Sequence, residues 1–246
     1  MTAMRRRAAG VVVAGFSLGL AGCAPPLDDP TRGWDEPASY TATVDYRAYD
    51  TEAGTYRIVV VNHVGFIDGP VVHGVIPRLN YFLIRADMFK GPLKPLLTWA
   101  AQIPVSGDGR SALAKGLAVL RRGDIVGVFP EGTRGGGTAE QVHGGAAWLA
   151  VQSGAPIIPT ALLGTRLPGE SVNLWPKPRR KMLVAFGEPF QLDLPADLKG
   201  RARQAAASEQ LAAALRTQLD KTLATTDLVL PKDDPLRERR AATEKP

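Results

Sequence analysis

The stretch YRIVVVN, at residues 56–62, decides the fold class of this chain. Its β-branched residues predict a strand, and no polar residue alternates with the apolar ones between Ile58 and Val61. A strand without polar alternation is covered on both faces, which is typical of a parallel sheet between layers of helices. Further strands are predicted at residues 81–85, 103–105, 125–129, 157–163 and 182–186.

Helical patterns lie between these strands, at residues 68–78, 92–101, 111–122 and 144–153. Another helix is predicted at 205–223, where Leu211, Leu215 and Leu219 recur at four-residue steps and form an apolar face. The alternation predicts one α/β domain over residues 54–225, with a mainly parallel central sheet flanked by helices.

Composition and charge restrict the class of partner. A chain of 246 residues with 45% hydrophobic content suits one domain with a sizeable core. The formal charge of +6 and a pI near 9.6 favour a phosphate-bearing partner, meaning nucleic acid, an anionic membrane or a phosphorylated small molecule. Because no recognition helix or aromatic ladder is present, we do not expect nucleic-acid binding. The single cysteine, Cys23, excludes an intramolecular disulfide, and no metal site or cofactor is expected.

The first 23 residues have the layout of a secretory signal. Three arginines at residues 5–7 precede an apolar stretch at 8–21, which is shorter than the ~20 residues of a membrane-spanning helix. The stretch ends in LAGC, which resembles the lipidation box of bacterial lipoproteins and makes Cys23 a lipidation candidate. A wrongly assigned start codon would produce a similar tract. Residues 24–53 are interpreted as a tether with at most one short strand, and 226–246 as a disordered tail.

The candidate catalytic pair is His63 and Asp68, in the segment NHVGFID directly after the first strand. Positions five apart in a helix point about 140° away from each other. The two side chains can therefore meet only if Gly65 and Phe66 form a turn before a helix begins near Asp68. Asp68 would then orient His63, and the imidazole would act as a general base. The alternative is an Asp68 that only caps its helix beside an unrelated surface histidine.

A second segment, FPEGTR at residues 129–134, follows another predicted strand. Gly132 allows the backbone to approach a ligand, and Arg134 offers a planar, bidentate grip on phosphate. Glu131 can hold a hydroxyl or orient Arg134. The alternative is an ordinary turn with an exposed ion pair. Two segments, one with a base and one with an anion binder, favour catalysis on a phosphorylated substrate.

Taken in order, NHxxxxD, the IPV strand, FPEGTR and the strand IIPTA resemble the glycerolipid acyltransferase family, which includes the 1-acyl-sn-glycerol-3-phosphate acyltransferases. The resemblance covers residues 56–190. It implies transfer of a fatty acyl group from acyl-CoA or acyl carrier protein to a hydroxyl of a lysophospholipid, most directly 1-acyl-glycerol-3-phosphate. It also implies that His63 is the general base, that Asp68 orients it, and that Glu131, Gly132, Thr133 and Arg134 bind the acceptor.

Two positions depart from the family pattern. Where the family commonly has an arginine after the IPV strand, this chain has Gly107, so Arg110 is the candidate to reach the same space. Where the family has a lysine after FPEGTR, this chain has His143. Both changes remove positive charge from the expected acceptor site. Transfer to another lipid acceptor and lipid binding without catalysis therefore stay open. Hydrolysis of acyl esters or thioesters also stays open, because a histidine and an aspartate can activate water instead of an alcohol.

Both the acceptor and the product implied by the resemblance are lipids, so a membrane surface is an expected partner. Residues 88–100 combine aromatic residues, leucines and two lysines, a composition suited either to an interfacial helix or to a core helix. Residues 174–181 place Trp175 beside four basic residues. Because the expected acyl donors are cytosolic, we expect the cytoplasmic face of the membrane, with an exported, lipid-anchored protein as the alternative.

Overall fold

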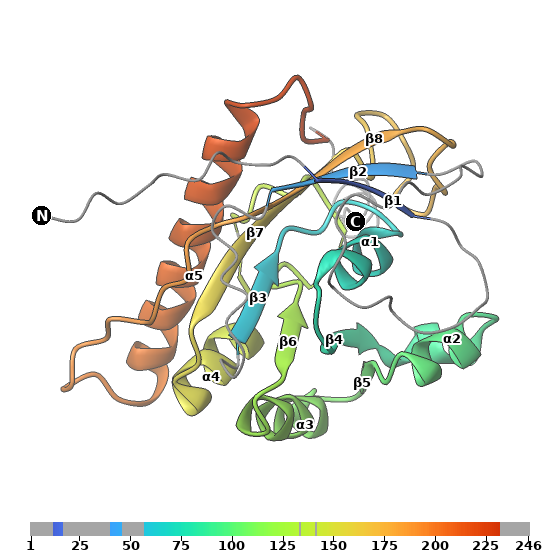
Figure 1. The fold of residues 1–246 in the computed structure, drawn as a ribbon. Coiled ribbons are helices and arrows are strands. Elements are labelled where there is room, and N and C mark those ends of the chain that lie inside the picture. Colours follow the sequence, from blue (N-terminus) through green and yellow to red (C-terminus); the bar gives the residue numbers. More distant parts are fainter. Residues whose placement is uncertain (1–11, 17–39, 46–56, 133, 141, 232–246) are drawn as a thin grey trace, which may run out of the picture.

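Within the described part of the chain, the sheet contains eight strands in the order β1-β2-β8-β7-β3-β6-β4-β5 (Figure 1). The computed structural model describes residues 12–16, 40–45, 57–132, 134–140 and 142–231. The strands are β1 (Val12–Phe16), β2 (Tyr40–Asp45), β3 (Arg57–Val61), β4 (Asn80–Arg85), β5 (Ile103–Val105), β6 (Ile125–Val128), β7 (Ile157–Leu163) and β8 (Lys181–Phe186). The helices are α1 (Asp68–Val75), the 3-10 helix η1 (Ala86–Lys90), α2 (Lys94–Trp99), α3 (Arg110–Arg121), α4 (Gly144–Ser153) and α5 (Gly200–Leu223).

The predicted α/β fold with a mainly parallel sheet is confirmed. Strands β7, β3, β6, β4 and β5 run parallel to one another, and β8 runs antiparallel to β7. Strands β5 and β7 and helix α4 have the bounds that the sequence predicts. The other predicted elements are found with shifts of a few residues at their ends, which is the ordinary uncertainty of such boundaries.

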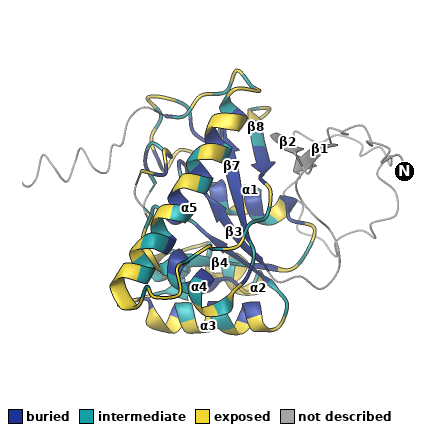
Figure 2. Ribbon diagram, turned by 90° about the vertical axis from the view of Figure 1, so that its left-hand side faces the viewer, coloured by how far each residue is buried: buried dark blue, intermediate teal, exposed yellow. Residues whose placement is uncertain are grey.

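The central strand β3 is covered on both faces, as its unbroken apolar run predicts. Ile58 and Val60 pack in the larger core, beneath α3, α4 and α5. Val59 and Val61 point to the opposite face and pack in the core under α1. All four side chains are buried, and Figure 2 shows the dark blue strands between helices whose outer surfaces are exposed. The protein is therefore a three-layer sandwich of helices, sheet and helix.

Two adjoining strands, β1 and β2, extend the sheet beyond β8. Strand β1 lies inside the apolar stretch that we interpreted as part of a signal segment, and β2 is the one short strand allowed in the tether. Residues 17–39, which include Cys23, lie outside the described part of the chain.

Some predicted boundaries need correction. Helix α1 ends at Val75 instead of residue 78, because Pro77 disfavours helical angles in the residue before it. Helix α5 begins at Gly200, five residues before its predicted start. The prediction missed this first turn because its residues are mostly polar and show no apolar periodicity. The predicted tail is also shorter at its start: Leu228 and Leu230 pack against the core, so residues 226–231 belong to the domain. The remainder of that segment, 232–246, lies outside the described residues.

The neighbouring strands β7, β3 and β6 all end at the same edge of the sheet, because they are parallel. Asn62, directly after β3, joins this edge to β7 through its side-chain amide. The Leu162 N–H donates to Asn62 Oδ1 at 2.7 Å, and Asn62 Nδ2 donates to the Leu162 carbonyl at 2.9 Å. Ligand sites in open α/β sheets form at the carboxyl ends of strands. His63 and Phe129 follow two of these strand ends, so both predicted motifs meet there.

Candidate active site

His63 and Asp68 lie in direct contact at the carboxyl end of β3. His63 Nδ1 is 2.8 Å from Asp68 Oδ2. The chain turns at residues 65–67 and α1 begins at Asp68, which is the geometry that the five-residue spacing required. The Asp68 side chain is fully buried, whereas that of His63 is 16% exposed. The histidine is therefore the member of the pair that a substrate can reach.

Hydrogen bonds to Asp68 determine which nitrogen of His63 carries the proton. Asp68 Oδ2 accepts from the backbone N–H groups of Val64 (2.7 Å) and Gly65 (2.8 Å), and Oδ1 accepts from Thr165 Oγ1 (2.6 Å). Since an ionised carboxylate can only accept, Nδ1 of His63 must donate to it. The Nε2 atom of the neutral ring then keeps its lone pair, as a general base requires.

The structure does not support the alternative in which Asp68 only caps its helix. The N-cap residue of α1 is Ile67, and no side chain makes a capping hydrogen bond there. The Asp68 carboxylate instead binds the loop before the helix, at Val64 and Gly65. An acidic residue in the first turn still interacts favourably with the helix dipole.

The His63 ring is fixed by contacts with the FPEGTR segment. It stacks on Phe129 with ring centroids 4.3 Å apart and an interplanar angle of 23°. Phe129 in turn stacks on Phe82 of β4 at 5.4 Å. The backbone of His63 is held as well, because the Gly135 N–H donates to the His63 carbonyl at 3.0 Å. The two motifs therefore form one unit, although 60 or so residues separate them in the sequence.

Glu131, Gly132 and Arg134 lie in the loop after β6, beside the NHxxxxD turn. Glu131 Oε1 is within 3.4 Å of the His63 backbone nitrogen, which donates to it. Gly132 has a φ of +66°, a left-handed conformation that favours glycine. Thr133 lies outside the described residues. The loop can therefore present backbone and side-chain groups to a substrate next to His63.

Arg134 is held in a half-buried position by three side chains. Its Nη1 donates to Asn173 Oδ1 at 2.6 Å, and Nη2 lies 4.0 Å from the Met88 sulfur. The guanidinium also lies over the Phe66 ring, 5.4 Å from the centroid. Burial lowers the pKa of Arg134 from its ordinary value, yet an arginine remains protonated at neutral pH. A partly desolvated cation near His63 is well suited to bind phosphate.

His143, which replaces the lysine of the family pattern, lies directly against Gly132. A Cβ atom on Gly132 would stand 2.5 Å from His143 Cδ2. The His143 N–H donates to the Pro130 carbonyl at 2.7 Å, and His143 is the N-cap residue of α4. This position therefore still borders the substrate loop, but with an imidazole instead of an ammonium group.

Arg110 does not join the rest of the predicted site in the described structure. It follows β5, the edge strand, which β4 and β6 separate from β3. Three strand spacings amount to roughly 14 Å. The Arg110 side chain is 89% exposed, and its Nε lies 3.0 Å from Asp108 Oδ2. Gly107 has a φ of +58°, so the chain has a conformation there that an arginine rarely adopts.

Two residues that the sequence analysis did not single out, Thr165 and Arg166, connect the site to β7. Arg166 is 1% exposed and donates to the carbonyls of Val64 (2.8 Å), Gly135 (2.9 Å) and Glu170 (2.9 Å). One buried cation thus ties the NHxxxxD turn, the FPEGTR loop and the loop after β7 together. The only signal in the sequence was a threonine and an arginine directly after a strand and a glycine.

The described residues offer neither a metal site nor a covalent nucleophile at His63. No group of three histidine, cysteine or acidic side chains is arranged to hold a metal ion within the described part of the chain. No serine or cysteine hydrogen-bonds to His63 among these residues, and Cys23 is not one of them. The geometry suits direct deprotonation of a bound hydroxyl.

The residues of this site were compared with the models of known protein families. The model of the family described as Acyltransferase matches residues 47–163, which contain His63, Asp68 and the FPEGTR loop. Residues 47–163 therefore match the acyltransferase family. The predicted family and the predicted class of enzyme, an O-acyltransferase, are confirmed.

Individual relatives of the acyltransferase domain agree with this assignment. The chain is 28% identical over 172 residues to a 1-acyl-sn-glycerol-3-phosphate acyltransferase from Bacillus subtilis (strain 168), covering 68% of this chain and 82% of that one. It is also similar in fold to the crystal structure of the 1-acyl-sn-glycerophosphate acyltransferase PlsC from Thermotoga maritima. That match has a TM-score of 0.58 and 20% identity and covers 74% of this chain and 72% of the other.

Proposed function

We propose that the protein transfers a fatty acyl group to the free hydroxyl of 1-acyl-glycerol-3-phosphate, giving phosphatidic acid. The observation that carries this is the hydrogen-bonded series Thr165–Asp68–His63, which stands beside the half-buried Arg134. The B. subtilis relative, whose name specifies this reaction, adds support. The acyl donor is acyl-CoA or acyl carrier protein.

His63 acts as the general base in this mechanism. Nε2 takes the proton of the acceptor hydroxyl while the oxygen attacks the thioester carbonyl. The C–O bond forms and the C–S bond breaks, and the departing thiolate receives the proton from His63. Asp68 stabilises the imidazolium that exists between the two transfers. General base catalysis of this kind contributes typically 10²–10⁴-fold, so its loss is readily measured.

Arg134 binds the acceptor phosphate, with Glu131 and Gly132 completing the glycerol side of the site. The guanidinium is a strong ligand because it is partly removed from water, where an ion pair with phosphate gains more than at an exposed position. Thr133 is proposed for the same site from the family pattern. Arg110, exposed and paired with Asp108, lies outside this acceptor site in the described structure.

Products identified by mass test this function. Purified protein is incubated with a panel of lysophospholipids, and with acyl-CoA or acyl carrier protein in separate reactions. Phosphatidic acid is the expected product, formed from 1-acyl-glycerol-3-phosphate in preference to acceptors without a phosphomonoester. Free fatty acid as the main product would indicate a hydrolase, and no turnover with any donor would indicate a lipid-binding protein.

We place the enzyme at the cytoplasmic face of the membrane, because both proposed donors are cytosolic. Within the described residues, no helix is long and apolar enough to span a bilayer. The alternative is an exported protein anchored through Cys23. Phase partitioning and mass spectrometry of the native protein separate the two, since a mature N-terminus at a lipidated Cys23 would overturn the cytoplasmic assignment.

A further inference from the structure

The segment 86–99, which contains η1 and α2, is an apolar surface that the core does not cover. No residue of η1 or α2 is buried. Trp99 is 81% exposed and Leu96 is 43% exposed. The sequence left a core helix and an interfacial helix open for this region, and the structure excludes the core helix. In Figure 1, α2 lies at the right-hand edge of the molecule, away from the centre of the sheet.

The loop 171–181, which leads into β8, carries a second exposed apolar pair. Leu174 is 43% exposed and Trp175 is 48% exposed. The Trp175 ring lies 6.0 Å from the ring of Phe66, which belongs to the NHxxxxD turn. This loop therefore reaches from the protein surface to the edge of the candidate active site.

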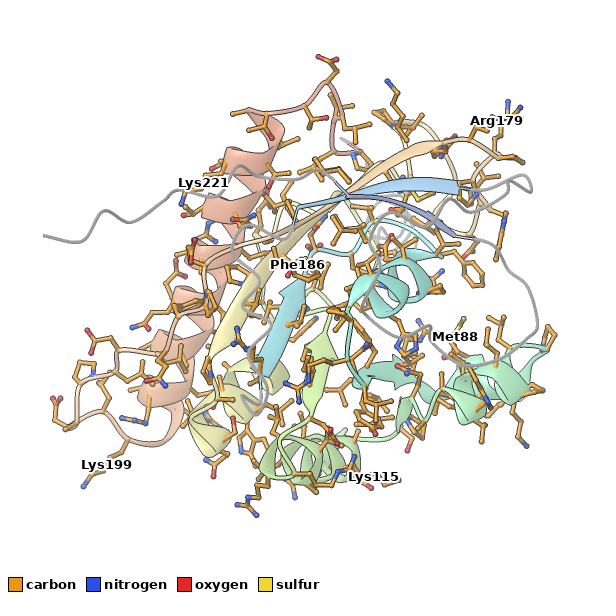
Figure 3. The ribbon with its side chains drawn as sticks, in the orientation of Figure 1. Met88, Lys115, Arg179, Phe186, Lys199 and Lys221 are labelled. Atoms are coloured by element: carbon orange, nitrogen blue, oxygen red, sulfur yellow. The ribbon has the colours of Figure 1, made fainter. Side chains whose placement is uncertain are left out.

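Both segments meet at Arg134. Met88 of η1 contacts Nη2 of Arg134, and Asn173 of the loop accepts a hydrogen bond from Nη1. Phe66 packs beneath the same guanidinium. The proposed phosphate ligand is thus bordered on both sides by segments that expose apolar side chains. Figure 3 labels Met88 and Arg179, one from each segment, in the right-hand part of the view, and Lys115 of α3 at its lower end.

Charge on the two segments is positive once their ion pairs are counted. Asp87 is paired with Arg85, and Glu170 is paired with Arg180. The remaining charged side chains of the two segments are all basic and exposed; they are Lys90, Lys94, Lys177, Arg179 and Lys181. Exposed tryptophan beside lysine and arginine is typical of a surface that inserts at the interface of an anionic bilayer.

We infer that segments 86–99 and 171–181 form one docking surface for an anionic bilayer. The inference rests on the proposed function, and it adds a route for the substrate. An acceptor lipid passes from the bilayer to Arg134 with its phosphate first, while its acyl chain stays among apolar side chains. An acidic protein would match the basic residues but would not explain exposed Leu96, Trp99, Leu174 and Trp175.

Vesicle sedimentation of the full chain, without acyl donor, tests the surface separately from catalysis. The vesicles are phosphatidylcholine with and without phosphatidylglycerol. Replacing Leu96 and Trp99 together by serine should lower the partition coefficient for vesicles at least about tenfold. The variant lacks two apolar side chains whose transfer from water into the bilayer favours binding. Lys90→Glu with Lys94→Glu should weaken binding only where phosphatidylglycerol is present, as should high salt.

Matched controls use exposed residues away from the docking surface. Leu79 is 72% exposed and precedes the amino end of β4, whereas η1 follows the carboxyl end of that strand. Lys115 is exposed on α3. Leu79→Ser and Lys115→Glu should bind vesicles like the wild type. Equal binding by the Leu96 and Trp99 double variant would overturn the inference, whether or not acyl transfer is observed.

A rate ratio tests the substrate route. The rate on vesicle-embedded acceptor is divided by the rate on a monomeric, short-chain acceptor, and the double serine variant should lower this ratio. If the variants bind vesicles normally but lose rate only with acyl carrier protein as donor, the surface docks that acidic protein and the bilayer assignment is wrong. If neither the wild type nor any variant transfers acyl groups, the proposed function is wrong, but the vesicle result still tests the docking surface.

Discussion

Thr165 donates a 2.6 Å hydrogen bond to Asp68, across 97 positions of the sequence, and thereby holds the carboxylate oxygen that does not face His63. Asp68 is fully buried, and its other carboxylate oxygen is bound by His63 and by the backbone N–H groups of Val64 and Gly65. The hydroxyl of Thr165 therefore fixes the rotation of the carboxylate, and the carboxylate fixes the imidazole. Through this contact β7 helps to position the base that follows β3.

Thr165→Val removes the hydroxyl but keeps the shape of the side chain. We expect kcat to fall about tenfold, which corresponds to about 1.4 kcal/mol in the transition state, because His63 is less well oriented. KM for the acceptor should change little, since Thr165 does not contact the proposed phosphate site. Thr165→Ser, which keeps the donor, should restore most of kcat. Steady-state kinetics of the three proteins give the answer, and an unchanged kcat in the valine variant would refute the positioning role.

Arg166→Lys should destabilise the fold more than it affects substrate binding. Lysine cannot reach three carbonyls in a fixed fork, so at least one buried acceptor loses its donor, at a cost of about 1–3 kcal/mol. For a domain of this size the Tm should fall by roughly 2–4 °C per kcal/mol. Arg110→Lys, at an exposed ion pair, is the matched control and should leave the Tm nearly unchanged. Equal melting of both variants would show that Arg166 does not tie the loops together.

Gly132→Ala should impair acceptor binding through two separable effects. The added Cβ meets the His143 ring, and the φ of +66° is strained for alanine. We expect a higher KM for the acceptor. Adding His143→Ala should relieve the collision but leave the backbone strain, so the double variant should recover only part of the binding. A Gly132→Ala protein with the KM of the wild type would place the acceptor elsewhere.

The Glu170–Arg180 pair predicts a pH dependence of stability. Hydrogen bonds from Arg180 lower the pKa of Glu170 below its ordinary value in the folded protein. The ionised pair therefore stabilises the fold above the unfolded pKa of about 4.3, and this contribution is lost as the pH falls through the lower folded value. Urea unfolding should show the full difference between wild type and Glu170→Gln at pH 7 and a smaller one below about pH 4. A difference that stays constant over this range would contradict the ion pair.

The fold could be predicted because its signals are local. An apolar run such as Ile58 to Val61 specifies a strand buried on both faces, and leucines at four-residue steps specify the buried face of α5. Where a residue lacks such periodicity, as in the first turn of α5, the predicted boundary is displaced. The same holds at 226–231, where single leucines pack on the core without any pattern.

The candidate site could be predicted only in part, for a related reason. The turn that joins His63 to Asp68 is encoded by neighbouring residues, with Gly65 between them. Thr165 and Arg166 act on that turn from about a hundred residues away, and no local spacing reveals such contacts. Arg110 shows the opposite case, in which closeness in sequence does not give closeness in space. It is near the expected position in the sequence, but it follows the edge strand β5 and therefore lies away from His63.

The most direct test of the central claim is the rate of phosphatidic acid formation by His63→Ala. Circular dichroism and the Tm first establish that the variant is folded, which is expected because the His63 side chain is partly exposed and is not part of the core. The account predicts that kcat falls by at least about 10²-fold, with vesicle binding retained. A folded variant that forms phosphatidic acid at the rate of the wild type would show that His63 is not the base.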